Sequence, residues 1–236
     1  MERLQKVIAN SGYCSRRKAE ELILQNKVSV NGQIVNELGT KVNGTDTIEI
    51  NGQMLNTNHD KVYYLLNKPR GVISSVSDEK GRKTVVDLIE TDKRIYPVGR
   101  LDYDTTGLLI LTNDGDLANK LMHPSNKIPK TYLAKLAGII DKDAIEKLKK
   151  GVVVEGRKVK IVDFKIKKKD LKKEVTYISI TIIEGRNHIV KNLFKELGYL
   201  VDKLTRTNYD FLELGTLASG EYRELSVKEV KKLYSK

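Results

Sequence analysis

The sequence predicts an α+β fold in which a small N-terminal module precedes a larger domain built around a mixed, largely antiparallel sheet. Residues 1 to 58 contain two short helical patterns, followed by short strands that are punctuated by Asn-Gly pairs. From Lys61 onward, strand and helix patterns follow one another in mixed order with several hairpins, which indicates an α+β domain. We therefore expect one domain over residues 1–58 and a second over residues 61–236, joined by a short polar linker at 56–60.

Two helices are predicted at the start of the chain. Apolar residues recur on one face of each helix: Leu4, Val7 and Ile8 in the first, Ala19, Leu22 and Ile23 in the second. Ser15 is the predicted N-cap of the second helix, which begins with Arg16, Arg17 and Lys18. Cations at this end oppose the helix dipole. A bound phosphate would compensate for them, and the alternative is an ordinary solvated basic turn.

The remaining elements follow from apolar periodicity and turn residues. In the N-terminal module, short strands joined by tight turns are predicted around 27–32, Asn43-Gly44 and Asn51-Gly52. In the larger domain, the predicted strands cover residues 62–66, 107–112, 131–137, 152–154, 158–166, 175–183 and 209–214. The predicted helices cover residues 116–122, 141–150, 187–197 and 227–233.

Composition restricts the class of protein and its partner. The chain has 236 residues, 39% of them hydrophobic, and a formal net charge of +12, which indicates a globular protein with a polyanionic partner or an anionic membrane surface. Nucleic acid is favoured over a membrane, because the basic residues are dispersed and the chain has no Trp and only 3 Phe. No apolar run could span a bilayer or serve as a secretion signal, so we expect no membrane association.

The single cysteine, Cys14, excludes an intrachain disulfide and suits a reducing compartment, so we expect a cytoplasmic protein. Cys14 is expected to be a small buried residue rather than a nucleophile, since no histidine lies near it in the sequence.

A polar loop directly before the predicted strand 107–112 contains Arg100, Asp102 and Asp104 within five residues. One interpretation is a turn whose aspartates accept hydrogen bonds from local amides, and the other is a functional acid on a rigid support. A metal site is not expected, because two carboxylates on one loop give an incomplete ligand shell and the histidines (His59, His123 and His188) lack metal-ligand spacing.

Three ordered segments resemble the RNA pseudouridine synthases, in the branch that modifies single sites in ribosomal RNA: LNKPRGVISS at 66–75, GRLD at 99–102 and EGRNHIVK at 184–191. Within that branch, the chain is most similar to enzymes of the large ribosomal subunit. The segment SRRKAE at 15–20, with the strands that follow it, resembles an S4-type RNA-binding domain. The resemblance implies a curved mixed sheet whose central cleft holds the active site, and a reaction that needs neither a metal nor a cofactor.

The resemblance also implies roles for individual residues. The GRLD aspartate of the family is the nucleophile, and that position is Asp102. An ionised acid in a dry cleft needs a nearby cation. Lys191 is the expected partner, with Arg186 as a second candidate. The family often has Gln and a basic residue where this chain has Ile189 and Asn192, so this motif departs from the usual pattern.

The target base must leave the RNA stack before it can react. Arg100 matches the family residue that fills the resulting gap or holds a phosphate, and Tyr132 matches the tyrosine that stacks on uracil. Tyrosine on a strand is otherwise more often a packing residue. The S4 resemblance favours an RNA contact at Arg16, Arg17 and Lys18.

Three functional classes remain open from the sequence, in this order: an RNA-modifying isomerase, a noncatalytic RNA-binding or ribosome-assembly protein, and an enzyme with a small substrate. The expected partner is ribosomal RNA, with 23S favoured over 16S, either free or in a large-subunit assembly intermediate. We expect a monomer.

Overall fold

The structure is a computed structural model that describes residues 1–57 and 60–235. The described chain divides into two compact units, and the first comprises residues 1–62 together with 91–95 and 113–115. The second unit contains the rest of the described chain. Residues 58 and 59 of the predicted linker, and with them His59, lie outside the described residues.

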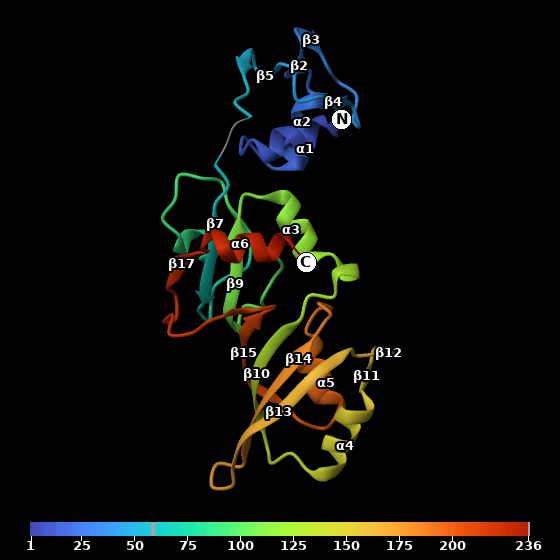
Figure 1. Cartoon of the computed structure of the whole chain (residues 1–236), viewed down its shortest axis with the longest axis vertical. Helices are drawn as coiled ribbons and strands as arrows, with labels where there is room; N and C mark the ends of the chain where they lie inside the picture. The colour runs from blue at the N-terminus through green and yellow to red at the C-terminus, as the bar shows by residue number, and fades with distance from the viewer. Residues whose placement is uncertain (58–59, 236) are drawn as a thin grey trace. The chain divides into compact units, whose positions relative to one another are not determined.

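The N-terminal unit combines two helices with short strands (Figure 1). Its elements are β1 (Glu2–Arg3), α1 (Leu4–Asn10), α2 (Arg16–Leu24), β2 (Val28–Val30), β3 (Gln33–Ile34), β4 (Lys41–Val42), β5 (Ile48–Ile50) and β6 (Gln53–Met54). Ser15 caps α2 by accepting a hydrogen bond from the Lys18 amide, as predicted. The apolar faces predicted for both helices form the core with residues of β2, β4 and β5. Cys14 is half-buried against this core, and burial raises the pKa of its thiol.

Two of the predicted Asn-Gly turns are hairpins. Asn31 and Asn51 have positive φ angles, as do the glycines that follow, which is the conformation that tight hairpins require. They join β2 to β3 and β5 to β6 in the sheet β3-β2-β5-β6. The turn at Asn43 instead connects two different sheets, because β4 pairs with β1. The Asp46 carboxylate accepts a hydrogen bond from the Asn43 amide and shapes this turn.

The second unit is built on a nine-stranded sheet within the described residues, with the main order β13-β14-β10-β15-β9-β7-β17. Neighbours along this order are antiparallel except β15 and β9, which run parallel. The strands of this sheet are β7 (Tyr63–Lys68), β8 (Tyr96–Pro97), β9 (Thr106–Thr112), β10 (Lys130–Ala137), β13 (Ile161–Asp170), β14 (Val175–Ile182), β15 (Val201–Tyr209), β16 (Leu212–Glu213) and β17 (Tyr222–Glu224). Two further strands, β11 (Val153–Val154) and β12 (Arg157–Lys158), form a separate sheet. The helices are α3 (Gly115–Met122), α4 (Lys142–Lys150), α5 (Ile189–Glu196) and α6 (Val227–Tyr234), with 3₁₀ turns at Val86–Leu88 and Pro124–Asn126.

The helices of this unit cover the sheet in two regions. In Figure 1, α3 and α6 lie over β7 and β9, and a shared core of buried leucine, isoleucine and valine side chains joins these four elements. α5 contacts β11 and β15 in the other half of the unit. Every residue of β9 from Gly107 to Thr112 is buried, so this strand is a rigid support for the loop that precedes it.

The α+β class is confirmed, and several element predictions need correction. The strand predicted at 62–66 continues to Lys68, because Lys68 still pairs with Gly107 before Pro69 interrupts the ladder. The strand predicted at 158–166 is two strands, β12 and β13. The strand predicted at 209–214 is a hairpin, in which Asp210 has a positive φ between β15 and β16.

Strands β15 and β17 are absent from the prediction. β15 contains mainly polar residues, and it forms because β10 and β9 pair with it on both sides. In the described part of the chain, no helix combines the length and the apolar character that a membrane span requires.

Candidate active site

Asp102 lies in a turn that is fastened to the segment 66–75. The Thr105 amide donates to the Asp102 carbonyl at 3.1 Å and closes the turn. The Ser74 hydroxyl donates to the Leu101 carbonyl at 2.8 Å and accepts from the Leu101 amide at 3.1 Å. The Gly71 amide donates to the Tyr103 carbonyl at 2.8 Å. Two motifs that are about 30 residues apart in the sequence therefore form one anchored loop.

Lys68 lies underneath this loop, and its side chain is 0% exposed. Its ammonium donates to the backbone carbonyls of Pro69, Asp102 and Thr105 at 3.1, 3.1 and 2.9 Å. An ammonium has three N–H donors, so these three acceptors satisfy it completely. Burial lowers the pKa of Lys68 to about 8, although the nearby Asp102 opposes this shift.

Gly107 allows the parallel strands β9 and β15 to meet directly after the loop. Its φ is +108°, and a Cβ at this position would lie only 2.3 Å from the Arg206 carbonyl oxygen. Only glycine fits such a close approach with this backbone conformation. The Arg206 guanidinium, 2% exposed, donates to the Leu108 carbonyl at 2.7 Å and lies over the Tyr209 ring.

Lys191, in the first turn of α5, is the cation beside Asp102. Its ammonium lies 2.9 Å from Asp102 Oδ2 and 2.6 Å from Asp104 Oδ1. His188 Nε2 lies 3.4 Å from Asp102 Oδ1, from a position with a φ of 52° directly before the helix. The Asp102 side chain keeps 26% of its surface exposed, so a ligand can reach it.

The charges of this cluster stabilise one another. The hydrogen bond from Lys191 holds the pKa of Asp104 below its usual value. Burial by itself would lower the pKa of Lys191, but its hydrogen bonds to Asp104 and Asp102 raise it above the usual value. Both groups therefore remain ionised at neutral pH.

Tyr132 is connected to the loop through the register of the sheet. On one side, Tyr132 pairs with Ile180 of β14. On the other side, a row of paired residues runs from Tyr132 through Arg206 of β15 and Gly107 of β9 to Lys68 of β7. Tyr132 and Lys68 are thus three strand spacings apart in one row, or about 14 Å between backbones. The Tyr132 side chain is 8% exposed.

Other predicted site residues lie outside this cluster. Arg100 is exposed two positions before Asp102 and forms no ion pair within residues 1–57 and 60–235. Arg186 forms an ion pair with Glu184 at 2.6 Å and donates to the Val154 carbonyl at 2.8 Å, so Lys191 rather than Arg186 is the partner of Asp102.

The basic residues at the start of α2 are exposed. Lys18 forms an ion pair with Glu21 at 2.7 Å. Arg16 and Arg17 form no ion pair with any residue that the structure describes, so their guanidinium groups are available to an anion.

The sequence prediction missed the contributions of Lys68, Asp104 and His188 to this cluster. Lys68 lies in the family segment at 66–75, but nothing in that segment indicates that its charge is buried. The sequence suggests for Asp104 a turn residue or half of an incomplete metal site, and the structure instead places the Lys191 ammonium within hydrogen-bonding distance of both carboxylates. Across the described residues, no three His, Cys, Asp or Glu side chains gather closely enough to hold one ion.

This arrangement presents the partly exposed carboxylate of Asp102 on a rigid turn, with the Lys191 ammonium at hydrogen-bonding distance. Such a group can act as a nucleophile or stabilise a developing positive charge. Comparison with known proteins identifies the chemistry, because the model of the RNA pseudouridylate synthase family matches residues 62–196. This chain belongs to the RNA pseudouridylate synthase family. The model of the S4 domain matches residues 2–48 of this synthase.

Full-length relatives support this assignment. This synthase is 53% identical to ribosomal large subunit pseudouridine synthase B of Bacillus subtilis, over 99% of this chain and 96% of the relative. It is 36% identical to a dual-specificity RNA pseudouridine synthase of Escherichia coli, over 98% of this chain and 78% of the relative. A crystal structure of a pseudouridylate synthase matches with a TM-score of 0.68 and 32% identity, over 99% of this chain and 100% of that chain. The predicted family and the predicted similarity to the large-subunit type are confirmed.

Proposed function

We propose that this synthase converts one uridine of 23S ribosomal RNA into pseudouridine, with Asp102 as the nucleophile. The observation that carries the proposal is the ion pair of 2.9 Å between Asp102 and Lys191, on the loop that contains the family motif. The choice of 23S RNA is supported by the large-subunit name of the 53% identical Bacillus relative.

In the proposed reaction, the bond between N1 of uracil and C1′ of ribose breaks while the Asp102 carboxylate stabilises or attacks C1′. The freed uracil turns, and its C5 forms the new bond to C1′. C5 then loses its proton, N1 gains one, and the carboxylate is released unchanged. Lys191 donates a hydrogen bond to the Asp102 carboxylate before the reaction and accommodates the change in the charge of this carboxylate during it.

Tyr132 and Arg100 are proposed to hold the flipped nucleotide. Reaction on a base requires its extraction from the stack, and aromatic side chains commonly pack on such a base. We propose that Tyr132 stacks on the uracil and assists removal of the C5 proton. Arg100, exposed beside the loop, fills the gap in the RNA or holds a neighbouring phosphate.

The N-terminal unit is proposed to position the RNA through Arg16, Arg17 and Lys18. Exposed cations around a helix N-terminus are suited to phosphate, and contacts of this kind position RNA without reading its sequence. Arg186 remains in the proposed RNA-binding set, although Glu184 already neutralises its charge.

The oligomeric state, the location and the form of the RNA substrate are also part of the proposal. We propose a monomer with domains at residues 1–58 and 61–236, acting in the cytoplasm on free 23S RNA or on a large-subunit assembly intermediate. The reaction balances without a metal or cofactor, because the C5–C1′ bond replaces the N1–C1′ bond and the proton lost from C5 is matched by the proton gained at N1.

The test is release of tritium from C5-labelled uridine in 23S and 16S transcripts, with the wild type and Asp102→Asn compared side by side. We expect release from 23S alone, which Asp102→Asn abolishes while retaining RNA affinity. The asparagine keeps the size of the side chain but removes its charge and nucleophilicity.

Different outcomes contradict different parts of the proposal. A substantially active Asp102→Asn enzyme would refute the nucleophile assignment. Release from 16S alone would refute the choice of RNA. If neither transcript reacts, the same assay on large-subunit assembly intermediates tests the remaining form of the substrate.

A further inference from the structure

One face of the sheet formed by β13, β14, β10 and β15 is open. Along β10 and β14, Tyr132, Ala134, Ile178 and Ile180 are buried, whereas the residues between them remain partly exposed. Such alternation is typical of an antiparallel sheet with one covered face and one face in solvent. The open face therefore lies on the reverse of the face that carries Tyr132.

This open face continues to the loop of the active site. Lys165 pairs with Ser179, Ser179 with Leu133, Leu133 with Thr205, and Thr205 with Thr106. The hydroxyls of Thr205 and Thr106 are 2.8 Å apart, so both side chains point to the same side. Thr106 is two positions after Asp104. A single row of paired residues thus connects the reaction loop with the outer strand β13.

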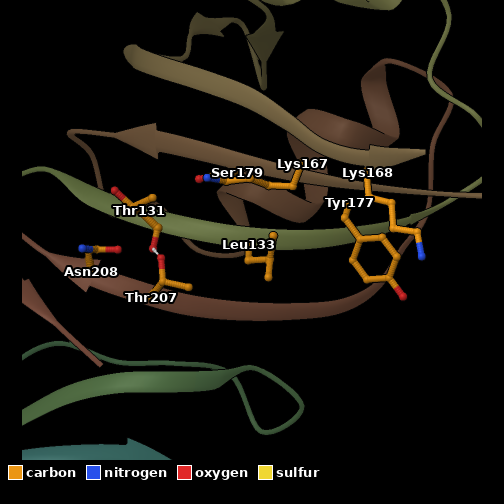
Figure 2. A pocket seen from close by; sticks show the side chains of 8 residues that line it. All are labelled: Thr131, Leu133, Lys167, Lys168, Tyr177, Ser179, Thr207 and Asn208. Carbon is orange, nitrogen blue, oxygen red and sulfur yellow. Dashed lines mark hydrogen bonds between the residues drawn. The ribbon is translucent and has the colours of Figure 1, made fainter. Parts of the chain in front are cut away.

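A hollow of about 530 Å³ lies on this face, and every residue that lines it except Leu133 has a polar group in its side chain. Figure 2 shows the lining side chains along the four strands: Thr131, Leu133, Lys167, Lys168, Tyr177, Ser179, Thr207 and Asn208. In this view Tyr177 and Lys168 lie next to each other at one end, and Thr131, Thr207 and Asn208 lie at the other. The hollow therefore offers hydroxyl and amide groups at one end and a cation beside an aromatic ring at the opposite end.

The charges in the hollow are positive. Lys167 forms no ion pair with any residue in the described part of the chain, and Lys168 has only a 3.5 Å contact with Asp170 while its side chain is 65% exposed. None of the lining residues is acidic. A hollow lined by two lysines and no carboxylate is complementary to an anion.

We propose that this open face binds the sugar-phosphate backbone of the RNA strand that adjoins the target uridine. The inference rests on the proposed function, because it assumes the same RNA substrate. Lys167 and Lys168 contact phosphates, the threonine hydroxyls and Asn208 contact ribose hydroxyls, and Tyr177 stacks on an unpaired base. These are the groups with which proteins recognise single-stranded RNA.

The first test replaces both lysines, in Lys167→Ala with Lys168→Ala, and measures RNA affinity against salt concentration by fluorescence anisotropy. Each lost phosphate contact should reduce the slope of log affinity against log salt by about 0.7 to 0.9. We expect RNA affinity to fall roughly tenfold at low salt. In the tritium assay, we expect KM to rise while kcat stays constant.

The matched control removes the same charge elsewhere in the unit, in Lys142→Ala with Lys147→Ala on α4. Both of these lysines are exposed. We expect the control to change the salt slope much less. Equal losses in both variants would show that only net charge matters and would overturn the proposed site.

A second test locates the RNA without affecting affinity. Ser179→Cys, in a Cys14→Ser background, carries a photoactivated crosslinker in the hollow, and Lys149→Cys on α4 carries it as control. We expect an RNA crosslink from position 179 that excess unlabelled RNA suppresses. No crosslink and an unchanged salt slope would overturn the inference, as would a crosslink from position 179 to protein only.

These measurements separate the inference from the proposed function. If the wild type binds and modifies 23S RNA but the lysine variant does so equally well, only the inference fails. If the wild type modifies no RNA but RNA binding still depends on the two lysines, the open face binds RNA and the proposed reaction fails.

Discussion

The ammonium of Lys68 donates a hydrogen bond of 3.1 Å to the backbone carbonyl of Asp102, while the Asp102 carboxylate is paired with Lys191 on the other side. One buried cation thus fixes the main chain of the proposed nucleophile, and a second, partly exposed cation fixes its side chain. This arrangement restricts the carboxylate without occupying its exposed surface. Preorganisation of this kind lowers the cost of reaching the transition state.

Lys68→Met should therefore impair the reaction more than RNA binding. The variant leaves the carbonyls of Pro69, Asp102 and Thr105 without their donor, which costs about 1 kcal/mol or more for each buried acceptor. We expect kcat to fall at least about tenfold with little change in RNA affinity. Single-turnover tritium release and anisotropy measure the two quantities. An equal loss of both would show a general folding defect instead.

The titration of Lys68 should have opposite effects on stability and activity. Its folded pKa of about 8 lies below the ordinary value of 10.5. Below pH 8 the lysine is charged in both the folded and the unfolded protein. Between pH 8 and pH 10.5 it is charged only in the unfolded chain, which therefore holds one proton more. Stability from this group therefore rises with pH across the window, by at most about 3 kcal/mol.

Activity should fall above about pH 8, because a neutral amine has only two donors for three carbonyls. Urea unfolding of the wild type and Lys68→Met at about pH 7 and about pH 10 tests the stability difference. A pH–rate profile tests the activity. If the two proteins show parallel pH dependence, Lys68 is not the titrating group.

Lys191→Met should remove the counterion of Asp102 and Asp104. Two carboxylates that share one ammonium would then repel each other, and one of them would gain a proton more readily. We expect a loss of about 100-fold in kcat, partly restored in Lys191→Arg. Single-turnover rates across a range of pH values measure this. Asp104→Asn is the control, and its loss should be smaller, since Lys191 keeps its contact with Asp102.

Gly107→Ala should destabilise the second unit strongly. The new Cβ would lie 2.3 Å from the Arg206 carbonyl in a conformation that disfavours alanine. We expect a loss of about 3 kcal/mol or more in the free energy of unfolding, measured by urea denaturation. Gly185→Ala is the matched control, because nothing lies within 4 Å of its added Cβ. Similar stability of both variants would mean that β9 and β15 can separate without cost.

Arg16→Ala with Arg17→Ala should weaken RNA binding without affecting the chemical step. If both guanidinium groups contact phosphates, the slope of log affinity against log salt should fall by about 1.5. Anisotropy at several salt concentrations gives this slope, and single-turnover release at saturating RNA gives the chemical rate. An unchanged slope would show that both residues face only solvent.

The sequence by itself determined the family, the two modules and the α+β class. These depend on local signals, such as the Ser15 cap, the Asn31 and Asn51 turns and the apolar run of β9, and on motifs in fixed order. Local signals can be recognised in the sequence because each depends on only a few neighbouring residues. The family motifs also predicted that Lys191 pairs with Asp102, and the structure contains this ion pair.

The tertiary structure alone decided which residues became neighbours over long separations. β15 forms because two strands flank it, although its own residues are mostly polar. Lys68 resembles a surface lysine in the sequence, and only the loop folded over it buries its charge and lowers its pKa. The Arg186 guanidinium likewise donates to the carbonyls of Val154 and Arg157, which the fold brings to it from about 30 residues earlier in the chain. Burial and pairing depend on all the surrounding chain, so no local pattern could have specified them.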